Sequence, residues 1–158
     1  MSVSATSDVM DSLADLEPNS PLWLLRRERP DVVHHTQGIE AALFHPSNDG
    51  GLSPVARAAA AFRIAELLRD PVLIAHYKAR LAAMPGKNPD PANSRRMAIL
   101  AHVERLTLDP DSARRIHLDE LSAAGLTPQA IVALSELVAY VNYQARVLAG
   151  LRMLKGAQ

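Results

Sequence analysis

The chain has 158 residues, a length that suits a single domain with its own hydrophobic core. Hydrophobic residue types make up 48% of it, which excludes a wholly disordered chain, and equal numbers of basic and acidic residues (17 each) exclude a global positive field for nucleic acid. The absence of cysteine excludes disulfides, thiolate metal sites and cysteine-based redox chemistry.

Prolines mark the starts of several expected helices. Each of these prolines follows a residue that can cap a helix: Ser20-Pro21, Ser53-Pro54, Asp70-Pro71, Asp109-Pro110 and Thr127-Pro128. The capping oxygen accepts a hydrogen bond from a free N–H of the first turn, and the following proline has no N–H to leave unpaired. Helices are therefore expected, in chain order, over residues 8–16, 21–28, 31–44, 55–69, 72–84, 94–108, 111–124 and 129–154.

The last expected helix is apolar almost all round. One stripe is formed by Ile131, Leu134, Val138, Val141, Ala145 and Leu148. A surface helix would show a polar half, so this helix is expected to be the centre of a bundle or to be shared with another subunit. No segment of the sequence alternates apolar and polar residues between hairpin signals, so the predicted fold is all-α.

Two parts of the chain repeat a pattern. Residues 51–54 read Gly-Leu-Ser-Pro and residues 125–128 read Gly-Leu-Thr-Pro, and Asp70-Pro71 and Asp109-Pro110 each stand at the same distance before a glycine. The pattern predicts a duplicated antiparallel helix pair, because a solenoid needs at least ~3 units. Loops rich in Pro, Asn, Asp and Gly are expected to separate the units, at residues 44–52 and 84–93.

Leu52-Ser53-Pro54, Arg57, an alanine-rich helix, a short corner and Ile74-Ala75-His76 follow one another in this order. The order resembles the core of the alkylhydroperoxidase D-like, or carboxymuconolactone decarboxylase-like, superfamily. Residues 125–154 resemble the last helix of its peroxidase-related branch. The resemblance covers roughly residues 50–155, and within the superfamily the sequence most resembles a small subgroup of carboxymuconolactone decarboxylase-domain proteins. It implies an alkylhydroperoxidase D-like helical bundle that assembles as a homo-oligomer through its long helices.

The peroxidase site of that superfamily is a Cys-x-x-Cys-x-x-x-His motif with an upstream glutamate, in which a thiolate attacks the peroxide. Carried over by position, His76 matches the histidine. The two cysteine positions hold Arg69 and Val72, and the glutamate position holds Ala58. Neither arginine nor valine can serve as the nucleophile, so thiol peroxidase activity by this mechanism is predicted to be absent.

Two classes of function stay open. The first is a cysteine-free structural or partner-binding member of a redox-linked system, for which the resemblance implies a separate cysteine-bearing, peroxidase-like partner protein. The second is a cysteine-independent decarboxylase, lyase or isomerase on a small acidic substrate, with His76 as acid/base and Glu66 facing it across the Asp70-Pro71 corner. An enclosed polar pocket that His76 shares with Glu66 or with the candidate binding residues Arg69 or Arg146 would favour the second class. A histidine packed among apolar neighbours, with no cavity, would favour the first.

Asn142 and Arg146 lie four positions apart and share a face of the last helix, which Ser135 and Ala139 continue. Buried polar groups need partners. The face is therefore expected to be either a hydrogen-bond network across a subunit interface or a pocket in which Arg146 receives a carboxylate bidentately. In either case Asn142 and Arg146 are candidate binding residues.

Other polar clusters are interpreted as surface features. Two arginine clusters, at residues 26–29 and 95–96, lack interleaved aromatics and indicate solvated surface or ion pairs with the acidic start of the chain, not nucleic-acid binding. Trp23 and its leucine neighbours are expected to anchor the front segment onto the bundle or another chain. Three histidine clusters lack matching carboxylates on other helices, so neither a metal nor a cofactor is expected: His34-His35, His102 with Glu104, and His117 with Glu120.

The expected organisation has three parts: a flexible segment over residues 1–20, helices packed on the core over residues 21–48, and an alkylhydroperoxidase D-like domain over residues 49–156. The start of the chain is polar and acidic, unlike a signal peptide. The longest uncharged apolar run, residues 137–145, is much shorter than the ~20 residues of a membrane helix. We therefore expect a cytoplasmic protein that does not bind membranes.

Overall fold

The computed structural model describes residues 8–85 and 93–156, and every regular element in these two ranges is helical. In chain order the elements are α1 (Val9–Leu13), α2 (Pro21–Arg27), α3 (Pro30–Phe44), α4 (Pro54–Leu68), α5 (Pro71–Ala82), α6 (Asn93–Leu108), the 3-10 helix η1 (Pro110–Ser112), α7 (Arg115–Ala123) and α8 (Pro128–Gly156). The all-α prediction is confirmed for these ranges. The predicted flexible start and the predicted loop at 84–93 lie partly outside them, at residues 1–7 and 86–92.

Side-chain caps start four helices at the predicted proline pairs. The capping oxygens accept first-turn N–H groups as follows: Ser20 from Trp23 (3.4 Å), Ser53 from Ala56 (3.2 Å), Asp70 from Val72 and Leu73 (3.0 Å each), and Thr127 from Ala130 (3.1 Å). In each case proline is the first residue of the helix, where an N–H would have no partner within the helix, so its absence costs no hydrogen bond. Local chemistry alone therefore fixes these four boundaries.

The helix predicted over residues 111–124 starts later than expected, because η1 is followed by an extended residue and α7 begins at Arg115. Asp109 makes no side-chain cap. The start of α7 is instead satisfied by His117, whose Nδ1 accepts a hydrogen bond from the Arg114 N–H (3.0 Å). Histidine is not among the usual capping residues, so no capping signal in the sequence marks this boundary.

The repeated sequence pattern builds the same turn twice. Gly51 and Gly125 both adopt left-handed backbone conformations (φ 90° and 85°), which glycine tolerates without steric cost. Leu52 and Leu126, which follow them, are both buried. The side chain of Arg95 donates to the carbonyl oxygens of both glycines and so ties the two turns together. The helix pairs that the pattern predicts are also present, because α4 packs against α5 and α6 against α7.

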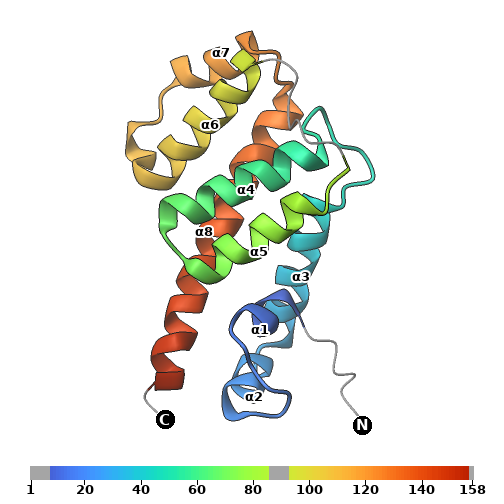
Figure 1. Ribbon diagram of the computed structural model, residues 1–158, viewed down its shortest axis with the longest axis vertical. Coiled ribbons are helices and arrows are strands. Elements are labelled where there is room, and N and C mark those ends of the chain that lie inside the picture. The colour runs from blue at the N-terminus through green and yellow to red at the C-terminus, as the bar shows by residue number, and fades with distance from the viewer. Residues whose placement is uncertain (1–7, 86–92, 157–158) are drawn as a thin grey trace.

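Helix α8 is the central element of the bundle. It contacts α1, α2, α3, α4, α6 and α7, and Figure 1 shows it running along the long axis of the molecule, with α6 and α7 near one end and α1 and α2 near the other. Leu134, Leu137, Val141 and Leu148 on α8 have no exposed surface. Helix α4 faces α8 and α5 with small residues, which lets the three helices approach closely. Over the two described ranges, none of the helices is both long enough and apolar enough to cross a membrane.

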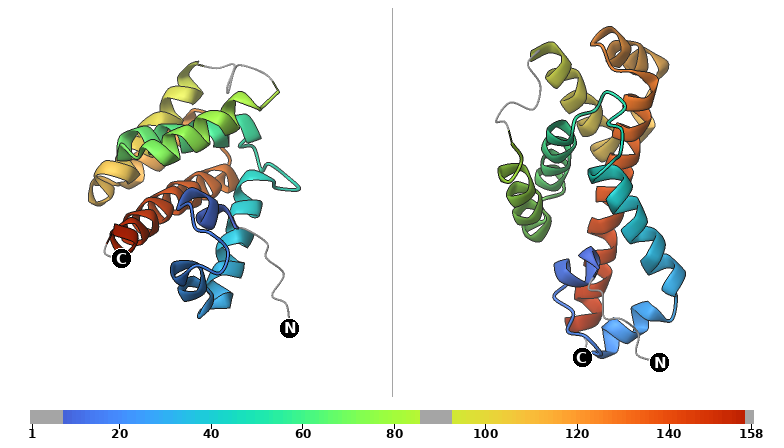
Figure 2. Two further views of the ribbon diagram at one scale, coloured as in Figure 1. Left: turned by 60° about the horizontal axis from the view of Figure 1, so that its bottom comes forward. Right: turned by 90° about the vertical axis from the view of Figure 1, so that its right-hand side faces the viewer.

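Ion pairs hold the front helices together. Arg26 of α2 pairs with Asp8 (2.9 Å) and with Asp11, and Arg27 pairs with Asp11 (2.6 Å). The guanidinium of Arg27 also lies 3.4 Å from the ring centroid of Trp23, which is buried as its predicted anchoring role requires. The arginines at the end of α2 are therefore ion-pair partners of the acidic start, one of the two expected outcomes. Figure 2 shows these helices beside the C-terminal half of α8.

Candidate functional site

The α4–α5 corner contains the positions at which the sequence resemblance predicts the redox motif. Ala58, at the glutamate position, is completely buried in the packed interior of α4 (0% exposed). Arg69 ends α4 in a left-handed conformation (φ 55°) and is exposed. Asp70 caps α5, and its carboxylate also accepts bonds from Arg152 of α8 (2.6 and 3.1 Å), which lower its pKa against the effect of burial. The corner is thus held by a structural ion pair.

His76 lies on α5 with a mostly buried imidazole. Its Nε2 is buried and has no hydrogen-bond partner among the described residues. The ring packs edge-on against Tyr77, with 4.8 Å between centroids. Burial, and next the positive charge of Arg80, lower the pKa of His76 below its ordinary value. The imidazole is therefore neutral near pH 7, which is the form that a general base needs.

The carboxylate that affects the pKa of His76 is that of Glu40 on α3. Its negative charge raises the pKa of His76 and so partly opposes the lowering caused by burial and Arg80. Glu40 is buried and forms an ion pair with Arg80 of α5. Glu66, the predicted partner of His76, is exposed and forms an ion pair with Arg63 on the same helix (3.4 Å). No contact found within the described ranges brings Glu66 to His76. The Glu40–Arg80 pair was not predicted, because the register between two packed helices leaves no signal in the sequence.

A buried polar network lies behind His76, between α5 and α8. The hydroxyl of Tyr77 donates to Oε1 of Gln144, and Nε2 of Gln144 donates to the hydroxyl of Tyr140 (3.2 Å). All three side chains are buried. Burial raises the pKa of Tyr77 and of Tyr140 far above the ordinary value of a phenol, so both stay protonated. The network therefore orients the two helices and supplies no acid or base near neutral pH.

Asn142 and Arg146 line one hollow of about 540 Å³ between the end of α6 and the middle of α8. Ser135 and Ala139 line the same hollow, as the shared helix face predicts. Nδ2 of Asn142 donates to the carbonyl of Val138 (3.0 Å), and its Oδ1 is 3.4 Å from the Arg146 guanidinium. The face thus lines a hollow, and these two hydrogen bonds lie within α8; a network across a subunit interface stays a prediction.

The wall of this hollow includes a serine in contact with a histidine. Oγ of Ser135 lies 3.1 Å from Nε2 of His102 on α6 and 2.9 Å from the carbonyl of Ile131, to which it donates. Nδ1 of His102 is buried and unpartnered among the described residues, and burial lowers the pKa of this imidazole. Thr107 of α6 also lines the hollow, and its hydroxyl oxygen is buried and has no partner among the described residues. Sequence reasoning grouped His102 with Glu104 and missed this pair.

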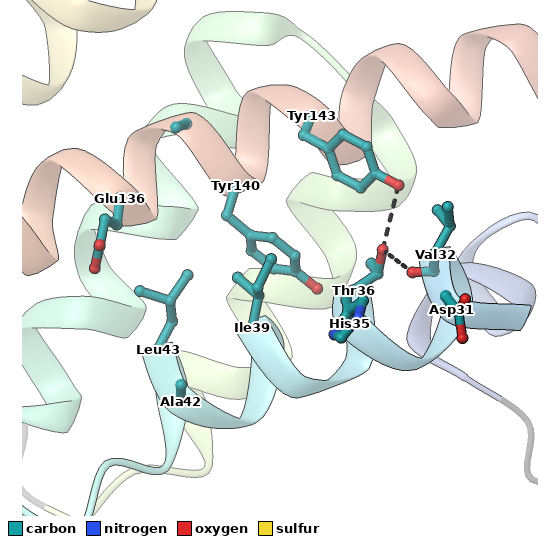
Figure 3. Close-up of a pocket in the computed structure, with 11 residues that line it drawn as sticks. Asp31, Val32, His35, Thr36, Ile39, Ala42, Leu43, Glu136, Tyr140 and Tyr143 are labelled. Atoms are coloured by element: carbon teal, nitrogen blue, oxygen red, sulfur yellow. Dashed lines mark hydrogen bonds between the residues drawn. The ribbon is translucent and has the colours of Figure 1, made fainter.

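A second and larger feature is an apolar groove of about 710 Å³ between α3 and α8, shown in Figure 3. Tyr140 and Leu43 form its buried floor, and Val32 and Ile39 form half-exposed walls. The Tyr143 hydroxyl lies 3.3 Å from Oγ1 of Thr36; because that oxygen already donates to the carbonyl of Val32 (2.7 Å), Tyr143 is the donor. We call this feature the α3–α8 groove.

Two carboxylates stand at opposite ends of the α3–α8 groove. Asp31 begins the groove at the start of α3, and Glu136 lies at the other end on α8, as Figure 3 shows. Both side chains belong to exposed residues. Apart from the phenols of Tyr140 and Tyr143, His35 is the one other titratable residue that lines this groove. The arrangement suits an apolar ligand that carries positive charge at its two ends.

Comparisons with known proteins leave the chain without an assigned family. No protein-family model matches the sequence, and no curated protein matches it. Within residues 8–85 and 93–156, no group of three or more histidine, aspartate or glutamate side chains is arranged to hold a metal ion. The geometry of the two surface features therefore carries the functional argument.

Proposed function

We propose that this is a partner-binding protein and that its docking surface is the α3–α8 groove. The occupant in this proposal is an amphipathic helix of another protein, with basic residues near both ends. The observation that carries the proposal is the groove itself, about 710 Å³ in volume, with an apolar floor and an exposed carboxylate at each end. Apolar grooves between helices are a common way to bind the apolar face of a partner helix.

The size of the groove supports a helical occupant. On α3 the lining runs from Asp31 to Leu43, about 18 Å of helix at ~1.5 Å per residue. A bound helix of about three to four turns would span this length. Val32 and Ile39 leave half of their surfaces in water (50% and 49% exposed), and a partner helix would cover them. Lysine or arginine at the ends of that helix would then lie near the two carboxylates.

The nature of the partner follows from the resemblance in the sequence. We propose that the chain is a cysteine-free member of the alkylhydroperoxidase D-like superfamily, and that the bound helix belongs to a cysteine-bearing protein of the peroxidase-related kind. The chain holds no cysteine, so the thiol chemistry of that superfamily has no nucleophile here. A second copy of this chain is the competing occupant, because the resemblance also implies a homo-oligomer.

The proposal is tested with a labelled helical peptide of about 15 residues that carries leucines on one face and lysines at both ends. Fluorescence anisotropy should show saturable binding to the wild-type protein. Binding should fall at least about tenfold for a peptide with glutamates at the ends, and also for Ile39→Ser, which removes an apolar wall. The matched control is Ile116→Ser on α7, an isoleucine of similar exposure (58%) outside the groove, and it should bind as the wild type does.

Three outcomes would overturn this proposal. The lysine peptide could fail to bind, Ile39→Ser and Ile116→Ser could bind equally well, or peptides with lysine and glutamate ends could bind alike. Sedimentation velocity of the same variants identifies the competing occupant. If Ile39→Ser dissociates a homo-oligomer that Ile116→Ser leaves intact, the groove binds a second copy and not a helix of another protein.

A second candidate function is acid/base catalysis at His76 without cysteine. The observation that favours it is the buried Nε2 of His76, which has no hydrogen-bond partner in the described part of the chain and belongs to a neutral imidazole. The substrate class in this proposal is a small acidic lactone, with decarboxylation or isomerisation as the reaction. The carboxylate beside His76 would be Glu40, not the predicted Glu66, and Arg69 would lie outside the reacting groups.

A further inference from the structure

The hollow between the end of α6 and the middle of α8 differs in charge from the α3–α8 groove. Its lining contains one cation, Arg146, and no carboxylate. The other polar residues in the lining are Ser135, Thr107 and Asn142. The Ser135 hydroxyl already donates to the carbonyl of Ile131, so the neutral donors left are the Thr107 hydroxyl and the second amide N–H of Asn142. A site with one positive charge, two neutral donors and no carboxylate is suited to an anion.

The donors of this hollow have unused capacity. Within the described ranges, the Arg146 side chain makes one hydrogen bond, a long one of 3.4 Å to Asn142, and no ion pair includes it. Because the planar guanidinium carries five N–H groups, most of them are free for a ligand. The hydroxyl oxygen of Thr107 is buried without a partner, which is costly, and a turn of this side chain toward the hollow would let a ligand satisfy it.

The rest of the lining is apolar. Leu106, Leu108, Val138 and Ala139 supply aliphatic surface beside the polar residues. A ligand that fills both parts therefore has a charged head and a short aliphatic body. Guanidinium groups pair with carboxylates through two parallel N–H···O bonds, a geometry that a planar carboxylate head matches.

We propose that this hollow binds a small aliphatic monocarboxylate. Arg146 receives the carboxylate, and the aliphatic body lies against Leu106 and Val138. The hydroxyl of Thr107, buried in the free protein, turns toward the hollow and donates to one carboxylate oxygen. Ser135 forms the adjoining wall, where its bond to His102 fixes its orientation. This site is separate from the α3–α8 groove, with which it shares the residue Ala139 alone. It does not depend on the proposed partner helix.

The test uses hexanoate as the probe and hexan-1-ol as its neutral counterpart. Titration followed by ¹H–¹⁵N correlation spectra should show saturable shifts at Thr107 and Arg146 with hexanoate, with a Kd of about 1–10 mM for a ligand of this size. Hexan-1-ol should bind at least about tenfold more weakly, because it cannot form the charged bidentate pair. Arg146→Gln should weaken hexanoate binding by at least about tenfold, and Thr107→Val, which removes only the hydroxyl, by about threefold.

The matched control is Arg115→Gln, which removes an exposed arginine of α7 outside the hollow and should leave hexanoate binding unchanged. Three results would refute the proposal: no saturable shifts up to about 50 mM hexanoate, equal binding of hexanoate and hexan-1-ol, or equal losses for Arg146→Gln and Arg115→Gln. Circular dichroism of each variant shows whether it is folded. Should Arg146→Gln not fold, Thr107→Val and the comparison with hexan-1-ol still decide the outcome.

Discussion

Arg57 supports the connection between α3 and α4, and its replacement by methionine tests that role. The residue is almost fully buried (3% exposed). Its guanidinium donates to three backbone carbonyls, those of Leu52 (2.8 Å), Leu43 (2.9 Å) and Asp49 (3.0 Å). These carbonyls belong to the end of α3 and to the loop that leads into α4. One side chain therefore fixes the connection between the two helices.

The magnitude follows from the three bonds. Two of them are buried, so Arg57→Met leaves two buried carbonyls without a donor, at about 1–3 kcal/mol each. The third bond, to Asp49, is only partly buried, and water can replace part of it. Methionine keeps much of the apolar stem, so lost packing adds little. We expect the free energy of unfolding to fall by about 3–6 kcal/mol.

Urea unfolding followed by circular dichroism measures this change. The matched control is Arg63→Met, which makes the same substitution on the same helix at a half-exposed arginine. Its ion pairs with Glu66 (3.4 Å) and Glu104 (3.6 Å) are exposed, so its loss should stay below about 1 kcal/mol. A value for Arg57→Met within about 1 kcal/mol of wild type, or equal to that of Arg63→Met, would show that the three bonds contribute little.

Two further predictions concern the buried histidines. Burial lowers the pKa of His76 and of His102, so the unfolded chain takes up protons first and the free energy of unfolding should fall as the pH drops below about 6.5. Urea titrations at about pH 7.5 and 5.5 should show this loss, and replacing both histidines by glutamine should flatten it; an unchanged slope would contradict the cause. His76→Gln should also abolish decarboxylation of a carboxylated lactone, followed by NMR, while leaving the protein folded. Equal turnover, or none by the wild type, would exclude His76 as an acid/base.

Much of the fold could be predicted because helix starts depend on neighbouring residues. Ser53 and Thr127 each cap the turn that follows a glycine and a buried leucine, so the same few residues in two places specify the same structure. The start of α7 was predicted at the wrong residue because a local capping pattern was present there but was not used. Asp109-Pro110 has the composition of a helix start, but the cap is made by His117, whose Nδ1 accepts from the N–H of Arg114 three residues earlier, outside the expected pattern.

The pairings between helices could not be predicted. Glu40 and Arg80 come from α3 and α5, and Ser135 and His102 come from α8 and α6. Each pair depends on how two packed helices are rotated and shifted against one another, and a single sequence does not encode that register in any local pattern. The shared face of Asn142 and Arg146 was predictable, because four positions on one helix always lie on the same side.

The distribution of unsatisfied polar atoms favours the α6–α8 side of the molecule as the place to look for a ligand. Buried charged groups elsewhere have partners: Asp70 pairs with Arg152, Glu40 pairs with Arg80, and Arg57 donates to three carbonyls. Among the described residues, three buried side-chain polar atoms have no partner, and two of them, in His102 and Thr107, belong to α6. Each unpaired buried polar group lowers the free energy of unfolding by about 1–3 kcal/mol. These groups are therefore an exception in a protein whose buried charged groups have partners. A ligand in the adjoining hollow would recover part of that cost at Thr107. If a bound ligand does not satisfy the Thr107 hydroxyl, Thr107→Val should leave the hexanoate affinity unchanged and make the free protein more stable.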